Sequence, residues 1–172
     1  MGSAGPFRGA KGNLYEGGTR EPFIVWAPGL IPTEKKGTTN EVTVMAGMDL
    51  PPSLLKIAGA NKDKGIRYDG IDMSKALLGK AEPIRKKPVM WQRTPENQKQ
   101  PGRDDLPDVS VREGRYKLLV NTDGSRPELY DLATDEGETT NLASENPKMT
   151  TRLKKKALKW VASMPAMRVT PE

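Results

Sequence analysis

The stretch RGAKGNLYEGGTREPFIVWAPG, residues 8–29, joins a glycine-rich loop to a short apolar run. The run FIVW, residues 23–26, has proline on both sides, and its length and content predict a strand buried on both faces, as in the parallel sheet of an α/β protein. The loop before it carries Lys11 between Gly9 and Gly12. A cation in so flexible a loop is either a surface residue in a turn or a group that binds an anion.

The composition of the 172-residue chain excludes several kinds of chemistry. With no cysteine and no histidine, the chain cannot form disulfides or the usual zinc and copper sites, so we predict no metal site in it. The residue type most often used as a general base near neutral pH is also missing. Because no run of 18 apolar residues occurs, we expect no membrane partner, and we expect no nucleic-acid partner either.

A short helix is predicted over residues 49–59. Asp49 is a suitable N-cap, proline is tolerated in a first turn, and a terminal glycine supplies the stop. This prediction turns Leu54, Leu55 and Ala58 toward the core.

The second half of the chain changes to an alternating pattern that is typical of antiparallel strands. Glycine-containing turns separate the apolar runs, as in a meander. The predicted elements are a helical turn near residues 73–78, a strand over 88–91, an exposed excursion over 92–107, and strands that place Val109 and Val111, then Tyr116, Leu118 and Val120, and then residues 128–132 in the sheet.

The C-terminal segment predicts an amphipathic helix that covers one face of the meander. Asn146 is its N-cap and Pro147 takes the first helical position. The basic run RLKKKALK, residues 152–159, is typical of a solvated helix face, and binding of a polyanion is the alternative. The apolar stripe of this helix consists of Met149, Leu153, Ala157, Trp160, Val161 and Met164.

Five ordered stretches of the chain resemble segments of the sulfatases. Residues 8–29 are similar to a pattern, G-K-G followed by E-G-G-x-R-x-P, that this family carries late in its catalytic domain. The other four stretches are MDLPPSLLKIAGA, DGIDMSKALLG, VREGRYKLL and ELYDLATDEGETTNLA, in register from about Gly5 to Trp160. Glu136 stands where the family usually has proline, and the N-terminal C/S-x-P-x-R motif of the family does not occur in this sequence.

The resemblance implies the C-terminal part of a sulfatase, cut inside the catalytic domain. The expected fold class is α/β: residues 1–85 form the end of a sulfatase or alkaline-phosphatase-like sheet domain, and residues 86–172 form a small antiparallel sheet with a C-terminal helix. The parent enzyme is expected to hydrolyse sulfate esters of sugars or aryl groups, with calcium and formylglycine in its N-terminal part. The chain alone is expected to hold no cofactor and to be inactive, and the parent to be periplasmic, secreted or lysosomal.

By the same resemblance, Lys11 is the sulfate-binding lysine of the parent. A fixed ammonium next to the sulfuryl oxygens stabilises charge that develops in the transition state. The long loop after the strand at 88–91 borders the substrate cleft in the family, which makes Arg93, Lys99 and Arg103 candidates for contact with a sulfated substrate.

Other motif residues are interpreted as structural. Glu16 and Arg20 are expected to form an ion pair that fixes the loop, and Gly17 and Gly18 to adopt positive φ. Asp131 and Asn141 are expected to hold the connection between the last strand and the helix.

A stand-alone module that binds sulfated glycans or other polyanions is the alternative function. The apolar run at residues 23–26 lacks neighbouring strands in this sequence, so we also expect self-association of the chain.

Overall fold

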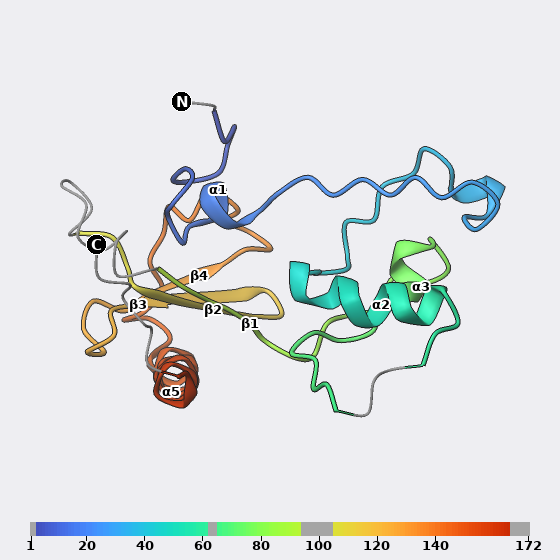
Figure 1. The fold of residues 1–172 in the computed structure, drawn as a ribbon. Helices are drawn as coiled ribbons and strands as arrows, with labels where there is room; N and C mark the ends of the chain where they lie inside the picture. The colour runs from blue at the N-terminus through green and yellow to red at the C-terminus, as the bar shows by residue number, and fades with distance from the viewer. Residues whose placement is uncertain (1–2, 62–64, 94–104, 166–172) are drawn as a thin grey trace, which may run out of the picture. The chain divides into compact units, whose positions relative to one another are not determined.

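The computed structural model describes residues 3–61, 65–93 and 105–165. They form two compact units, of which the first joins Met1–Glu21 to Lys87–Glu172 and the second is Pro22–Lys86. The first is named the sheet unit below, and the second the inserted unit (Figure 1). The predicted division at residue 85 therefore differs from the observed grouping, because the first 21 residues fold with the C-terminal half.

The sheet unit is built on a four-stranded antiparallel sheet in the order β1-β2-β3-β4. Alternating apolar residues and the tight turn at Gly114, with φ of +59°, set the pairing of β2 with β3. The predicted meander is thereby confirmed, and β1 adds a fourth strand at its edge. The strands are β1 (Val89–Gln92), β2 (Val109–Glu113), β3 (Tyr116–Val120) and β4 (Glu128–Asp131).

One face of the sheet is covered by helix α5 (Pro147–Ser163). The side chain of Asn146 accepts a hydrogen bond from the backbone N–H of Met149 at 3.3 Å, which caps the helix as predicted. Leu153 and Ala157 are fully buried against the sheet, whereas Trp160 is only partly buried. The fully buried core of this face consists of Val109, Val111, Leu118, Val120, Leu129, Leu153 and Ala157.

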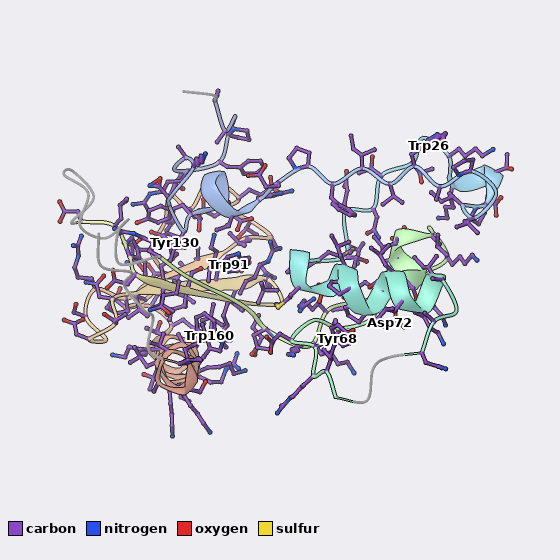
Figure 2. All side chains as sticks on the ribbon, viewed as in Figure 1. Trp26, Tyr68, Asp72, Trp91, Tyr130 and Trp160 are labelled. Atoms are coloured by element: carbon purple, nitrogen blue, oxygen red, sulfur yellow. The ribbon has the colours of Figure 1, made fainter. Side chains whose placement is uncertain are left out.

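The opposite face of the sheet is covered by the N-terminal segment and its one-turn helix α1 (Glu16–Thr19). Leu14 and Tyr15 pack there against Leu119, Tyr130 and Leu132. Trp91 and Tyr130 lie on the side of the sheet that faces α1, whereas Trp160 lies on α5 at the other side (Figure 2). Burial of this second face explains why the first 21 residues belong to the sheet unit.

The inserted unit contains η1 (Thr33–Lys35), η2 (Gly47–Asp49), α2 (Leu50–Ile57) and α3 (Ser74–Leu77). The hydroxyl of Ser53 connects α2 to α3, because it donates to the carbonyl of Asp49 at 2.5 Å and accepts from the N–H of Met73 at 2.8 Å. The buried residues of α2 are therefore Pro52 and Ser53. The predicted inward positions of Leu54 and Ala58 are wrong, and Leu54 is 55% exposed.

The side chain of Asp49 does not cap α2, although the residue stands at the N-cap position. Its carboxylate accepts hydrogen bonds from the backbone N–H groups of Ala46 at 2.8 Å and Ile71 at 2.9 Å, and from the guanidinium of Arg85 at 2.5 Å. Both charged side chains are buried, so Asp49 organises the inserted unit instead of a single helix end.

The run at residues 23–26 forms no strand, and its side chains are exposed, with Ile24 at 89% and Trp26 at 86%. The prediction of a buried strand is wrong for this structure. Among the described residues of the inserted unit there is no strand to which the run could hydrogen-bond. None of the helices in the described part of the chain has the length and hydrophobicity that crossing a bilayer requires.

Glu113, at the end of β2, ties the sheet to α5 through hydrogen bonds from Arg152, at 2.5 Å, and from Lys156. Burial raises the pKa of the Glu113 carboxyl, but the bonds from Lys156 and Arg152 outweigh this effect, so its pKa lies below the usual value. The ionised form of Glu113 therefore stabilises the folded sheet unit.

Truncation of the helix stripe tests the position of α5. We expect Leu153→Ala to lower the free energy of unfolding by about 2–5 kcal/mol, because it leaves a cavity in a fully buried site. Trp160→Ala should cost less than the roughly 3–5 kcal/mol that is typical of a fully buried tryptophan. Urea unfolding measures both variants, with the exposed Lys159→Ala as control; equal losses for Leu153→Ala and Lys159→Ala would contradict the packing of α5.

The lowered pKa of Glu113 gives a pH-dependent contribution to stability. This contribution is complete above the pKa of an unfolded glutamate, about 4.3, and is lost as the pH falls through the lower folded pKa. In Glu113→Gln, the loss of stability between about pH 5 and about pH 2 should be smaller than in the unaltered chain. Urea midpoints across this range measure the difference, and parallel pH profiles would show that Glu113 is not a stabilising carboxylate.

Candidate functional site

The loop that carries Lys11 is folded back onto α1 by its own backbone. The N–H of Gly17 donates to the carbonyl of Arg8 at 2.8 Å, and the N–H of Asn13 donates to the carbonyl of Ala10 at 2.9 Å. Gly9 and Gly12 have φ values of +84° and +91°, where glycine is favoured. This geometry produces a compact turn with Lys11 exposed.

Lys11 itself makes no hydrogen bond or ion pair with any other residue that the structure describes. Its ammonium group therefore keeps its capacity to bind an external anion. An exposed cation held between two glycines is able to approach an anion together with backbone N–H groups, as in other anion-binding loops.

Gly17 and Gly18 are needed for close approach and not for positive φ, so the predicted reason was wrong. Both lie in the helical turn of α1. A Cβ atom on Gly17 would lie 2.6 Å from the carbonyl oxygen of Arg8, and one on Gly18 would lie 2.3 Å from that of Asn13. The glycine pair thus allows the loop backbone to rest directly on α1.

The predicted ion pair between Glu16 and Arg20 is also wrong. The buried carboxylate of Glu16 accepts a hydrogen bond from Lys117 Nζ at 2.8 Å and another from Arg112 at 3.4 Å. Arg20 pairs instead with Glu136 at 3.2 Å. The sheet beneath α1 supplies the cations for Glu16, because β2 and β3 present Arg112 and Lys117 on that face.

A second buried carboxylate, Glu138, completes the cluster. Its Oε2 accepts a hydrogen bond from the backbone N–H of Glu16 at 2.6 Å, and its Oε1 lies 3.2 Å from Lys117 Nζ. Burial raises the pKa of the Glu138 carboxyl, although the ammonium of Lys117 acts in the opposite direction. The fully buried Lys117 thus lies between carboxylates from the N-terminal and C-terminal segments.

Arg8 and two tyrosines form a polar cluster at the start of the loop. The guanidinium of Arg8 lies 3.9 Å above the ring of Tyr15 and donates a hydrogen bond to the hydroxyl of Tyr130 at 2.7 Å. Both tyrosine hydroxyls donate to Glu128. Burial and the neighbouring Glu128 carboxylate raise the pKa of both phenols, so they remain protonated donors at neutral pH.

An open pocket of about 580 Å³ lies beside this cluster. Gly9 and Asn13, on either side of the Lys11 turn, form part of its wall, as do Glu128 and Arg126. Arg126 is held by an ion pair with Asp105 at 3.1 Å. The volume is in the range of sites that bind small molecules.

The three predicted substrate contacts are not brought together in the described structure. Arg93 is buried, and its guanidinium donates a hydrogen bond to the carbonyl of Leu106 at 2.6 Å. Lys99 and Arg103 lie outside the described residues.

Asp131 and Asn141 lie in the connection that follows β4. The guanidinium of Arg115 donates to Asp131 at 2.5 Å, and this bond lowers the pKa of the Asp131 carboxyl. The amide oxygen of Asn141 accepts hydrogen bonds from the N–H groups of Leu129, at 3.0 Å, and Ala143, at 2.9 Å. Both residues therefore hold the connection to the end of the sheet.

Lys117 and Glu138 were not identified from the sequence, although one signal for Lys117 was present. If Tyr116, Leu118 and Val120 face α5, alternation places Lys117 and Leu119 on the other face. A lysine beside a buried leucine on that face indicates a buried ionic partner. No local pattern indicates Glu138, since its partners are about a hundred or more residues away along the chain at Glu16 or in β3.

Comparison with known proteins identifies relatives over most of the chain. The family described as N-sulphoglucosamine sulphohydrolase, C-terminal, matches residues 9–163. A sulfatase of Formosa agariphila is 35% identical over 158 residues, which cover 85% of this chain and 27% of that protein. Human arylsulfatase A is 33% identical over 163 residues, which cover 82% of this chain and 29% of that protein.

A solved structure shows the same fold. It comes from Bacteroides thetaiotaomicron, under a title that concerns the metabolism of multiple glycosaminoglycans, and it matches with a TM-score of 0.71 and 22% identity. The match covers 93% of this chain and 32% of that one. The chain thus spans between a quarter and a third of the length of these relatives.

Substitution of the glycine pair tests how the loop rests on α1. We expect Gly18→Ala to destabilise the chain by about 1–3 kcal/mol, because the added methyl group meets the backbone carbonyl of Asn13. Gly47→Ala is the matched control, since a Cβ there meets open space at a φ that is not positive. Thermal unfolding compares the two, and equal melting temperatures would contradict the close approach.

Proposed function

We propose, since this chain belongs to the family of C-terminal sulfatase segments related to N-sulphoglucosamine sulphohydrolase, that it supplies the sulfate-binding lysine of a sulfuric ester hydrolase. The observation that carries this proposal is the state of Lys11. It is exposed at the tip of a loop held by α1, it has no partner within the described residues, and it lies inside the family match.

The chemical role of Lys11 in this proposal is electrostatic. Its ammonium group binds the sulfuryl oxygens and stabilises the negative charge that grows on them as the ester bond breaks. The loop backbone keeps this cation in place before the substrate arrives, so no free energy is spent on ordering it in the transition state. Tyr15 and Tyr130 stay protonated and donate hydrogen bonds to Glu128.

Calcium and formylglycine belong to the proposed parent enzyme and not to this chain. Among the residues that the structure describes, no group of three carboxylates or other ligands lies where it could hold a metal ion. The residues present therefore do not fit a calcium site, and no step through calcium or formylglycine is derived.

The proposed substrates are sulfate esters of sugars or aryl groups. The names of the relatives support both classes, since they include arylsulfatase A and an N-acetylgalactosamine-6-sulfatase of Canis lupus familiaris, 40% identical over 80 residues. The pocket beside Gly9 and Asn13 has space for the group that carries the sulfate. Contact of Lys99 and Arg103 with such a substrate is part of this proposal, as is a periplasmic, secreted or lysosomal location of the parent.

The stand-alone polyanion-binding module is not favoured. Similarity to enzymes extends over more than four fifths of the chain, from the Lys11 loop into α5.

Replacement of Lys11 tests the proposed function. In the full-length protein, Lys11→Ala should lower kcat for an aryl sulfate or a sulfated sugar by about 10²–10³-fold, the effect of removing one group that stabilises the transition state. Steady-state kinetics measure it, with the exposed helix residue in Lys155→Ala as the charge-matched control. Equal rates for both variants would overturn the role of Lys11. The 172-residue chain alone should show no hydrolysis above background, and turnover by it would contradict the proposal that it is inactive.

A further inference from the structure

The buried lysine of β3 lies beneath the loop that carries Lys11, and we propose that Lys117 is a positioning residue of the sulfate site. It acts through Glu16 and α1, which together form the base on which the Lys11 loop rests. This inference rests on the proposed function, because it takes Lys11 to be the group that binds sulfate.

The burial of Lys117 needs an explanation beyond stability. Its side chain is completely buried, and its Nζ lies 2.8 Å from Glu16 and 3.2 Å from Glu138, with the hydroxyl of Thr19 also at 3.2 Å. Desolvation of three charged groups offsets much of their mutual attraction, so an apolar side chain of similar volume often stabilises a fold as well. What an apolar residue cannot do is fix the position of two carboxylates.

The position of Glu16 determines the position of α1. Its side chain is bound by Lys117, and its backbone N–H is bound by Glu138 at 2.6 Å. Two attachments on one residue define the orientation of the helical turn and not only its distance from the sheet. α1 has only four residues and no side-chain cap, so it depends on these contacts for its order.

The position of α1 in turn determines the Lys11 loop. The N–H of Gly17 holds the carbonyl of Arg8, and the carbonyls of Ala10 and Asn13 lie against the bare Cα of Gly18. Since the glycines leave no space between the two segments, a displacement of Glu16 shifts the loop as well. The contacts thus form a continuous path from Lys117 to the residues on both sides of Lys11.

The first experiment measures the loop directly in the 172-residue chain by hydrogen exchange. In Lys117→Met, the amides of residues 9–19 should exchange about tenfold faster or more relative to those of β2, because their opening becomes local. Leu153→Ala is the control, since it weakens the opposite face of the sheet without touching the loop. Equal relative exchange in both variants would overturn the proposal.

Should Lys117→Met fail to fold, the triple variant with Glu16→Gln and Glu138→Gln replaces it. This variant removes the unpaired buried charges and keeps a hydrogen-bond acceptor for the N–H of Glu16. Faster exchange of the loop in a folded triple variant would support the positioning role, and unchanged exchange would overturn it.

The second experiment is a double-mutant cycle on kcat/KM in the full-length protein. If Lys117 acts through Lys11, Lys117→Met should lower kcat/KM about tenfold alone but have little further effect in the background of Lys11→Ala. Leu153→Ala combined with Lys11→Ala should be additive. Additive effects for Lys117→Met as well would assign it a general structural role and overturn the inference alone. A full-length protein without sulfatase activity would overturn the proposed function, while the exchange data would still report whether Lys117 holds the loop.

Discussion

The ion pairs of Lys117 with Glu16 and Glu138 are the interaction on which the sheet unit depends. A charged side chain inside a sheet must be neutralised by groups that other segments bring to it. Here one carboxylate comes from the first 21 residues and the other from the segment after β4. The two ends of the chain therefore meet over one face of the sheet, which explains why the N-terminal segment is separated from the residues that directly follow it.

Much of the sheet unit was predictable because its signals are local. Alternating residues such as Val109 and Leu118 identify the strands, and Asn146 with Pro147 marks the start of α5. These patterns depend on neighbours in sequence, whose geometry is set by the backbone. The cover of the second face was not predictable in this way, because it is formed by a segment about a hundred residues away.

The failures have the same physical origin. Glu16 and Arg20 are four residues apart, which suggested a local pair, yet the buried cations of the sheet lie closer to Glu16 than Arg20 does. The run at residues 23–26 shows that its side chains are apolar, but an apolar pattern does not state which partner covers it. Pairing over a long sequence separation is therefore what a single sequence conceals, both in the core and at the candidate site.

The motif that joins Lys11 to Glu16, Gly17 and Gly18 can now be understood as one mechanical unit. Glu16 anchors α1 to the sheet, the two glycines let the loop backbone lie against α1, and Lys11 projects from that loop without a partner among the described residues. Each part requires the others, since an anchored helix without the glycines would hold the loop away. The spacing of this motif is therefore set by the geometry of one helical turn, and its binding residue is left exposed because every other contact of the loop is already made.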